Sequence, residues 1–350
     1  MTHPRPAAAA VCLFLSLLLI LTGCMPKAPS SQSRPESSEL SSEFVSELSS
    51  EPVSELPSEL SSELSSDLSS EPVSKPVSEP VSQLPDKGPE THPIEINAAS
   101  ALLYEEGADR LLYAKNIHRH AAPASLTKLV TACTALSFVP EDAVFTVGSE
   151  RDLVPAGSSI CLLQKGHRLT LKALLYGLLL RSGNDAAYTI AVNTARSHTG
   201  NPDMSDQEAL ASFNTLTAEF TQRLGLKDSV FLTPDGFDLE GQHTSAADLL
   251  RISLCALKHS LIAEIVQTRQ KQVIFASGEV ANWSNSNKLL QKNSPYYDPD
   301  ANGLKTGTTP DAGFCLIASA VKNGKLRIAV VLGCPDDDTR YRAAETLLNL

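Results

Sequence analysis

The sequence predicts a mixed α/β (α+β) domain over residues 94–350, and three observations carry this prediction. Apolar residues recur at helical spacing in the stretch 126–133, and again in a run that ends near Leu180. Two apolar, β-branched runs flank Asn323-Gly324, a dipeptide typical of a β-hairpin turn. The region is long enough for one large domain or for a domain with two lobes.

A signal peptide is expected at the N-terminus, over residues 1–23. Arg5 precedes an apolar segment, 7–21, that is shorter than the roughly 20 residues of a membrane-spanning helix. The segment leads into Leu-Thr-Gly-Cys, which resembles the cleavage site of bacterial lipoproteins and would make Cys24 the lipidated first residue. An ordinary signal peptide with an incidental Cys24 is the alternative. Two or more acyl chains on one residue would anchor the chain stably at a membrane, which a single chain does not.

Residues 24–93 are predicted to be a disordered tether, because their composition differs from that of the domain. Between Glu39 and Glu71 an acidic residue recurs at every fourth position, while prolines interrupt the pattern and serine fills the gaps. Low hydrophobicity, proline and same-sign charge argue against a packed fold. Such a chain would span roughly 40 to 50 Å on average.

The tether also accounts for most of the net charge of −11. Residues 31–90 carry 13 acidic and three basic side chains, whereas the domain that follows is nearly neutral. The acidity of the chain is therefore no argument about the substrate of the domain. Nucleic-acid binding would need a basic face, and nothing in the sequence suggests one.

Five cysteines follow Cys24, and we expect buried thiols because the number is odd and the surroundings are apolar. They are Cys133, Cys161, Cys255, Cys315 and Cys334. A single bridge between Cys315 and Cys334 across the hairpin stays open as the alternative. The eight histidines show no metal-ligand spacing, and neither HExxH nor GxSxG occurs, so we predict no metal, no cofactor and no α/β-hydrolase site.

The stretch Pro-Ala-Ser-Leu-Thr-Lys, 123–128, places Ser125 three residues before Lys128 where a helix is expected to begin. Positions i and i+3 share a helix face, so the lysine amine can approach the serine oxygen. The alternative is a capping serine followed by a surface lysine. A second Ser-x-x-Lys, Ser319 to Lys322, lies on a predicted strand, where residues three apart point to opposite faces.

A second group of polar residues, Ser182-Gly183-Asn184, follows the apolar helix that ends near Leu180. The glycine favours a turn between two helices, which would expose a hydroxyl and a carboxamide together. An ordinary solvated turn is the alternative. Another Ser-x-Asn, 212–214, lies inside a predicted amphipathic helix, where no loop presents it.

A third group, Lys305-Thr306-Gly307, occurs once, at the predicted start or edge of a strand that leads into the hairpin. A lysine and a threonine beside a glycine can present a cation and a hydroxyl while a ligand lies close to the backbone. The tripeptide alone is weak evidence, because glycine and threonine are common near strand ends.

The three groups occur in order behind an export signal, and together they resemble the active-site set of penicillin-binding proteins and serine β-lactamases. The segments 231–250, 283–290, 303–309 and 340–348 resemble those of the low-molecular-mass serine D-alanyl-D-alanine carboxypeptidases. This resemblance covers nearly all of residues 94–350. It implies a DD-peptidase/serine β-lactamase-like fold, an antiparallel five-stranded sheet packed by helices beside an all-helical lobe, with the site in the cleft between them.

The resemblance also implies a role for each matching residue. Ser125 would be the nucleophile and Lys128, its pKa lowered by burial and a neighbouring cation, the general base. Ser182 would relay a proton to the leaving nitrogen, while Asn184 would orient Lys128 or the substrate. The backbone N–H groups of Ser125 and Thr308 would form an oxyanion hole. The residues expected to hold the substrate carboxylate are Lys305, Thr306, Gly307 and Arg340.

Three departures refine this resemblance. The second group reads Ser-Gly-Asn, as in the carboxypeptidases, and not Ser-Asp-Asn as in class A β-lactamases. No Glu-x-x-x-Asn segment follows at the distance where such β-lactamases carry a deacylating glutamate; the region around Glu219 does not supply it. We also expect no C-terminal β-rich domain, since the sequence stops at Leu350, so that an N-terminal lipid would replace the C-terminal anchor of many relatives.

The sequence therefore indicates a lipid-anchored serine DD-carboxypeptidase on the outer face of the bacterial cytoplasmic membrane. Its expected substrate is a peptidoglycan stem peptide ending in D-Ala-D-Ala, and β-lactams are expected to acylate it. A DD-endopeptidase or a β-lactamase on the same fold is one alternative. A catalytically idle lipoprotein that binds cell wall or senses β-lactams is the other.

Overall fold

A computed structural model describes residues 94–350. The predicted signal peptide (1–23), Cys24 and the predicted tether (24–93) lie outside the described residues. Within the described part of the chain, no helix is both long enough and apolar enough to cross a bilayer.

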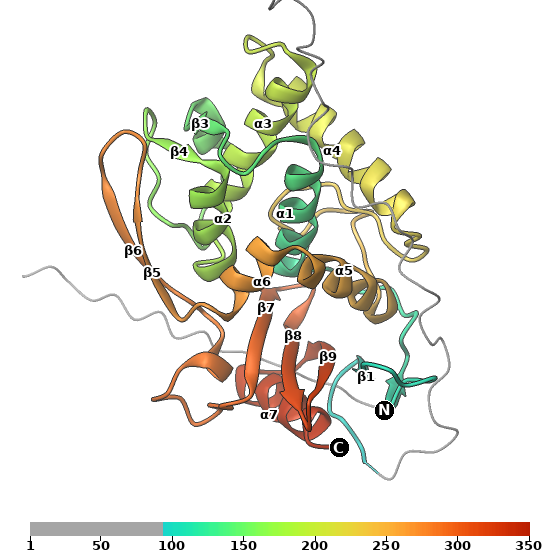
Figure 1. Cartoon of the computed structure of the whole chain (residues 1–350). Helices are drawn as coiled ribbons and strands as arrows, with labels where there is room; N and C mark the ends of the chain where they lie inside the picture. The colour runs from blue at the N-terminus through green and yellow to red at the C-terminus, as the bar shows by residue number, and fades with distance from the viewer. Residues whose placement is uncertain (1–93) are drawn as a thin grey trace, which may run out of the picture. The chain divides into compact units, whose positions relative to one another are not determined.

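The core of the domain is one antiparallel sheet of five strands in the order β2-β1-β9-β8-β7 (Figure 1). The two N-terminal strands are β1 (Ser100–Glu105) and β2 (Tyr113–Lys115). The three C-terminal strands are β7 (Ala301–Thr309), β8 (Gly313–Lys322) and β9 (Lys325–Cys334). The predicted five-stranded sheet is thus confirmed, and β7 forms one of its edges.

The hairpin between β8 and β9 turns where the sequence predicts. Lys322 pairs with Lys325, and the two residues between them have positive φ angles, 53° at Asn323 and 77° at Gly324. Asparagine and glycine tolerate this conformation, and such turns match the twist of the flanking strands. The Ser-x-x-Lys on β8 is structural, because Ser319 donates to Asn302 and Lys322 pairs with Asp298 and Asp300.

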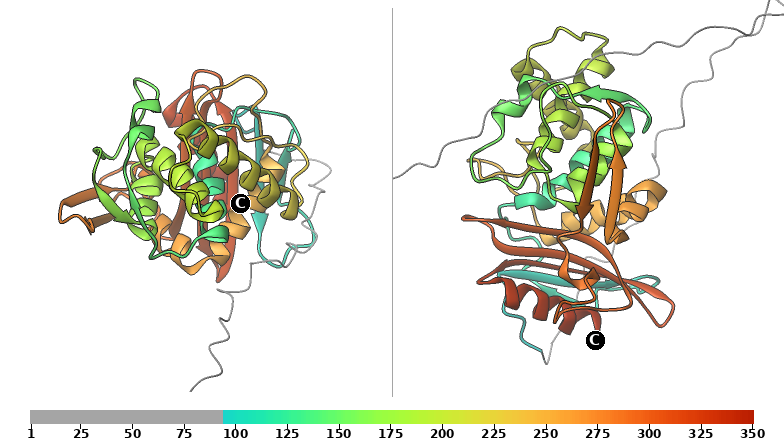
Figure 2. Two further views of the ribbon diagram at one scale, coloured as in Figure 1. Left: turned by 90° about the horizontal axis from the view of Figure 1, so that it is seen from above. Right: turned by 90° about the vertical axis from the view of Figure 1, so that its left-hand side faces the viewer.

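Helices cover both faces of the sheet, as the right-hand view of Figure 2 shows. On one face, α7 (Asp337–Leu348) packs through Tyr341 and Leu347 against side chains such as Leu103 and Val331. The opposite face takes the alternate residues of the same strands and belongs to a larger core. That core includes α5 (Ala246–Lys258) and α6 (Ser260–Gln267).

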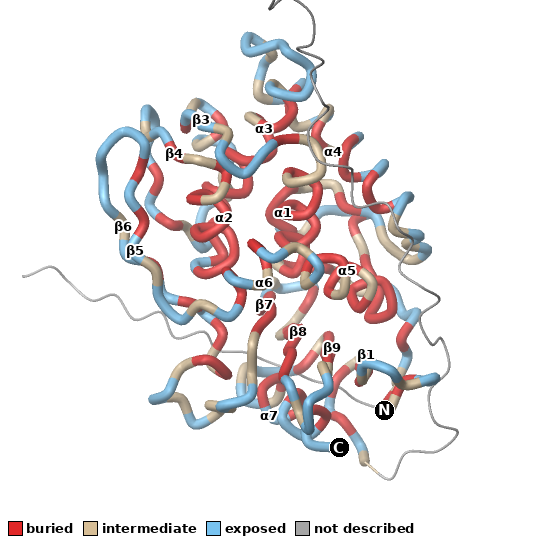
Figure 3. Tube along the Cα trace, in the orientation of Figure 1, coloured by how far each residue is buried: buried red, intermediate tan, exposed pale blue. Residues whose placement is uncertain are grey.

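The other helices form a lobe beside the sheet. It contains α1 (Thr127–Phe138), α2 (Leu171–Leu180), α3 (Asn184–Thr199) and α4 (Asp206–Arg223). Short elements complete it: β3 (Val144–Thr146) with β4 (Arg168–Thr170), β5 (Gln270–Ile274) with β6 (Val280–Ser284), and the 3-10 turns η1 (Ala124–Leu126) and η2 (Ser149–Leu153). A third 3-10 turn, η3 (Lys288–Leu290), packs with α7 against the sheet instead. The first nine residues of α1 are buried, as Figure 3 shows, so α1 lies inside the lobe.

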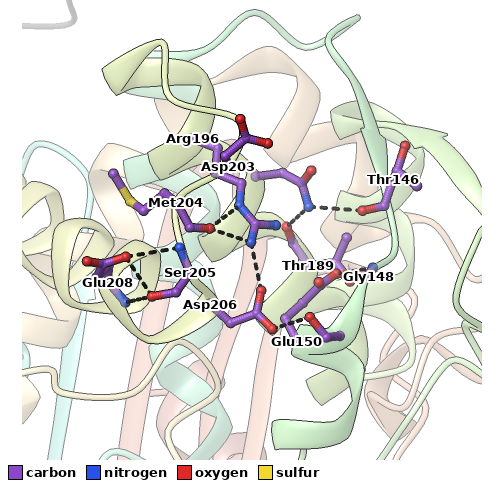
Figure 4. Close-up of polar contacts among 12 residues, drawn as sticks. Thr146, Gly148, Glu150, Thr189, Arg196, Asp203, Met204, Ser205, Asp206 and Glu208 are labelled. Carbon is purple, nitrogen blue, oxygen red and sulfur yellow. Dashed lines mark hydrogen bonds and ion pairs between the residues drawn. The ribbon is translucent and has the colours of Figure 1, made fainter.

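Polar contacts fasten α3, α4 and η2 to one another (Figure 4). Arg196 pairs with Asp206 at 2.8 Å and donates twice to the Met204 carbonyl. Ser205 and Glu208 form a reciprocal capping box at the start of α4, which satisfies backbone donors there. The second Ser-x-Asn lies within this helix, as expected, so no loop presents it. Its asparagine, Asn214, donates to the Leu232 carbonyl.

All five cysteines of the described residues are buried free thiols. This confirms the prediction of buried thiols, and it leaves Cys315 and Cys334 unbridged although they lie near one another on the β8–β9 pair.

Candidate active site

Ser125 and Lys128 meet at the entrance of α1. The Lys128 amine donates to the Ser125 hydroxyl oxygen at 2.8 Å. Ser125 lies in the 3-10 turn η1, just before the α-helix, and Ala124 before it has a positive φ of 47°. Ser125 is partly exposed whereas Lys128 is completely buried, which excludes a surface lysine beside a capping serine.

Burial controls the protonation of Lys128. Removal from water lowers the pKa of its amine to about 8, although Asp235 and Asp185 act in the opposite direction. At pH 7 about a tenth of such amines are neutral, against far fewer for an exposed lysine. The amine also donates to the Asp235 backbone carbonyl at 2.9 Å, so it is fixed by two acceptors.

Ser182 lies in the turn between α2 and α3, as the sequence predicts. Its φ of 57° is left-handed, and it is largely buried. Gly183 follows because the turn is crowded: a Cβ there would lie 2.8 Å from both Asp185 Oδ1 and Cys161 Sγ. Asn184 opens α3 and donates its amide N–H to Asp235 Oδ2 at 2.6 Å.

Lys305 reaches this turn from β7. Its amine donates to the Ser182 hydroxyl at 3.0 Å and to the Thr306 carbonyl at 2.9 Å. Burial, and then repulsion from Lys128 and Arg340, hold the pKa of Lys305 well below its usual value. The expected lowering of the Lys128 pKa by burial is thus present, but the expected lowering by a neighbouring cation is not. Cation repulsion lowers the pKa of Lys305 instead.

The edge strand β7 passes close to the serine. A Cβ added at Gly307 would lie 3.0 Å from Ala124 Cβ and 3.3 Å from the Ser125 backbone nitrogen, so a larger residue would require β7 or η1 to shift by a few tenths of an ångström. The Thr306 carbonyl accepts from Lys305 and therefore faces the site. Alternate residues of an antiparallel strand present their backbone groups on the same side, which turns the Thr308 N–H the same way.

Arg340 supports β7 from α7. Its Nη1 donates to Thr308 Oγ1 at 2.9 Å, to the Gly307 carbonyl at 3.1 Å and to the Cys315 carbonyl at 3.3 Å, and its Nη2 pairs with Asp337. The guanidinium is largely buried. The structure thus places Arg340 beside the predicted carboxylate-binding residues, with its donors directed at the protein. Thr306 completes this group, and its hydroxyl lies 3.3 Å from that of Ser286.

Comparison with known proteins shows to which family the chain belongs. The family model of the D-alanyl-D-alanine carboxypeptidases matches residues 87–336. The chain belongs to this family.

The D-alanyl-D-alanine carboxypeptidase family includes curated relatives of moderate identity. The chain is 34% identical to the carboxypeptidase DacD of Escherichia coli over 73% of its length and 29% identical to DacF of Bacillus subtilis over 75%. It spans 63% and 64% of those two proteins. The crystal structure of the Streptomyces K15 DD-transpeptidase superposes on this chain with a TM-score of 0.66, and the two sequences are 28% identical. The match covers 74% of this chain and 98% of that one. The DD-peptidase fold is confirmed.

Sequence reasoning missed Asp235 as a member of the site. This aspartate is 1% exposed and contacts Lys128 through its carbonyl and Asn184 through its carboxylate. Among the described residues, Asn184 and Lys128 therefore form no hydrogen bond with each other. Both donate to Asp235 instead. In the sequence, the segment 231–250 indicates only the family resemblance, because nothing local to Thr-Pro-Asp-Gly indicates contacts more than 50 residues away.

Proposed function

We propose that this protein is a serine DD-carboxypeptidase, which removes the terminal D-alanine of peptidoglycan stem peptides through an acyl-enzyme. The observation that carries the proposal is the hydrogen bond between the partly exposed Ser125 and the completely buried Lys128. A buried amine with a pKa of about 8 can take a proton near neutral pH, which an ordinary lysine cannot do efficiently.

Acylation begins with the loss of the Ser125 proton to neutral Lys128. The serine oxygen attacks the carbonyl carbon of the penultimate D-alanine, and the carbonyl oxygen takes the negative charge. The backbone N–H groups of Ser125 and Thr308 stabilise that oxyanion, which the close approach of β7 to η1 favours.

Collapse of the tetrahedral intermediate breaks the C–N bond. Ser182 relays to the leaving nitrogen the proton that Lys128 took from Ser125, so that Ser182 keeps its hydroxyl and Lys128 is neutral again. Lys305 holds the Ser182 hydroxyl in place. D-Alanine departs, and water then attacks the ester, with its proton taken by Lys128, to release the shortened peptide and restore Ser125.

The substrate carboxylate binds beside Lys305, Thr306 and Gly307, with Arg340 behind β7 adding positive charge. An incoming anion offsets the repulsion that Lys128 and Arg340 exert on Lys305, and so favours its protonated form. Carboxylate binding and protonation of Lys305 are therefore coupled, which suits a peptidase that selects a free C-terminus.

The test uses the purified full-length protein with penicillin and with a soluble stem peptide ending in D-Ala-D-Ala. Mass spectrometry should find one penicilloyl group on Ser125, absent from Ser125→Ala, and the wild type should release free D-alanine. A folded protein that is never acylated and releases none would overturn the proposal. Turnover of a cross-linked dimer or of the β-lactam itself would instead identify an endopeptidase or a β-lactamase.

We also propose that the chain is exported and anchored by a lipid on Cys24 to the outer face of the cytoplasmic membrane, with residues 24–93 as tether. The Leu-Thr-Gly-Cys ending and the serine, proline and glutamate composition support this proposal. The wild type should fractionate with membranes and Cys24→Ala should not. Shortening the tether should spare activity on soluble peptide but reduce trimming of intact cell wall; equal trimming would contradict the role of the tether.

A further inference from the structure

A single buried aspartate links the base of the site to its carboxamide. The Asp235 carbonyl accepts from Lys128 at 2.9 Å, and its Oδ2 accepts from Asn184 at 2.6 Å. Its Oδ1 accepts from the Phe237 backbone N–H at 3.0 Å. We propose that Asp235 is a positioning residue that orients both Lys128 and Asn184 for the reaction. This inference rests on the proposed function of the site.

The loop that carries Asp235 is fixed on both sides. Thr131 of α1 donates to the Pro234 carbonyl at 2.6 Å. Gly236 has a φ of +80°, and a Cβ there would lie 1.8 Å from the Ala124 carbonyl oxygen, so the loop backbone lies directly against η1. Gln242 accepts from the backbone N–H groups of Leu232 and Thr233 and donates to the Phe237 carbonyl. Asp235 is therefore held in one place relative to Ser125.

The carboxylate of Asp235 also decides which way Asn184 points. A carboxylate only accepts hydrogen bonds, so it selects the amide nitrogen of Asn184 as its partner. The carboxamide oxygen of Asn184 must then face away from Asp235, where it can accept from a substrate N–H or from an amine. A neutral amide at position 235 would offer both donors and an acceptor, and the orientation of Asn184 would no longer be selected.

The charge of the same carboxylate acts on Lys128. Around the amine lie Ser125 of η1, Asp235 of the loop, Asp185 of α3, Cys161 of the segment before β4, and Lys305 of β7. Burial lowers the pKa of Lys128, and the two carboxylates limit that fall. Loss of the Asp235 charge should therefore lower this pKa further, and acylation should begin at a lower pH.

The decisive variant is Asp235→Asn, with Asp238→Asn as the matched control. Asp238 lies in the same loop but accepts from the Asp311 N–H, away from Lys128. The second-order rate of acylation by a fluorescent penicillin is measured on the full-length protein from about pH 6 to pH 10. Asp235→Asn should move the midpoint of the rise in acylation rate to a pH lower by about half a unit to one unit, and should lower the plateau rate. Asp238→Asn should leave both the midpoint and the plateau unchanged. An unchanged midpoint would overturn the inference that the Asp235 charge raises the pKa of Lys128.

A second variant separates positioning from folding. The exchange Asn184→Asp with Asp235→Asn restores a hydrogen bond of reversed polarity between the two positions. The thermal midpoint of unfolding should recover relative to Asp235→Asn, while the acylation plateau should stay low. Recovery of both would mean that the pair only supports the fold, which overturns the proposal.

A third measurement works even if the protein is never acylated. Titration of ¹³Cε-labelled lysines by NMR, with Lys128→Arg to assign the signal, reports the protonation of Lys128 directly. A lower midpoint in Asp235→Asn supports the inference whatever the reaction proves to be, and an equal midpoint contradicts it. Absence of acylation in the wild type is thereby assigned to the proposed function and not to Asp235.

Discussion

The Lys305 amine donates to the Ser182 hydroxyl at 3.0 Å, across 123 residues of sequence. This hydrogen bond joins β7 of the sheet to the turn between α2 and α3 in the helical lobe. Ser125 and Lys128 enter from η1 and α1, and Asp235 enters from the loop between α4 and α5, so the site is assembled from four separate segments. The relationship makes Lys305 the natural place to test recognition of the substrate.

Lys305→Gln should reduce kcat/KM for a peptide ending in D-Ala-D-Ala by about 10- to 100-fold, since a hydrogen bond to a charged group is worth about 1.5–3 kcal/mol. The same peptide with a C-terminal amide should be a poor substrate for the wild type and should lose much less in the variant. Lys322→Gln, which alters a lysine paired with Asp298 and Asp300, should change neither rate. Equal losses on acid and amide would contradict a role in carboxylate binding.

The acylation rate of the wild type should rise with pH through about 8 and then level off. The reason is that neutral Lys128 is the reactive form, and its pKa is lowered by burial to about 8. Rate constants for penicillin acylation across this range check the prediction. The range from about pH 6 to about pH 9 includes this pKa. A rate that stays flat over the range, or falls as pH rises, would exclude Lys128 as the base.

The same pKa predicts how stability depends on pH. Below about pH 8 both folded and unfolded chains carry a protonated Lys128, and the cost of burying that charge is fully present. Between about pH 8 and the ordinary lysine pKa of 10.5 the unfolded chain binds the proton and the folded chain does not, so the free energy of unfolding rises with pH. Against Lys128→Met, the wild type should gain up to about 3 kcal/mol over this interval. Denaturant titrations of both proteins at several pH values measure the difference, and a constant difference would contradict the lowered pKa.

Gly307→Ala should lower acylation by about 10-fold, because its Cβ would lie 3.0 Å from Ala124 Cβ and move β7 away from Ser125 by a few tenths of an ångström. Gly107→Ala is the control, since a Cβ there meets nothing within 4 Å although its φ is +80°. The control should lower the thermal midpoint and leave acylation intact. Full acylation of Gly307→Ala would show that the close approach is not needed.

The two Ser-x-x-Lys copies should respond differently to the loss of their serine. Ser125→Ala should abolish acylation, whereas Ser319→Ala should keep it, because Ser319 is buried on β8 and donates to Asn302 at 2.6 Å. Loss of that hydrogen bond should cost about 1 kcal/mol of stability. Acylation assays and unfolding curves of the two variants check both halves of the prediction.

Much of the fold and site could be predicted because the signals are local. The spacing of Ser125 and Lys128 depends on one helical turn, and Asn323-Gly324 depends on the φ angles of two residues. The contacts of Arg340 could not be predicted in the same way. Its donors reach Gly307, Thr308 and Cys315, and only the packing of α7 on the sheet brings these together.

The sequence by itself determined the family, the mixed α and β fold, the order of the three active-site groups and the buried state of the cysteines. Each of these depends on residue type and on spacing within an element. Only the tertiary structure decided that Asp235 contacts Lys128 and Asn184, that Lys305 holds Ser182, and that the pKa of Lys128 falls to about 8. The physical reason is that desolvation and long-range hydrogen bonds exist only once segments distant in sequence have packed together.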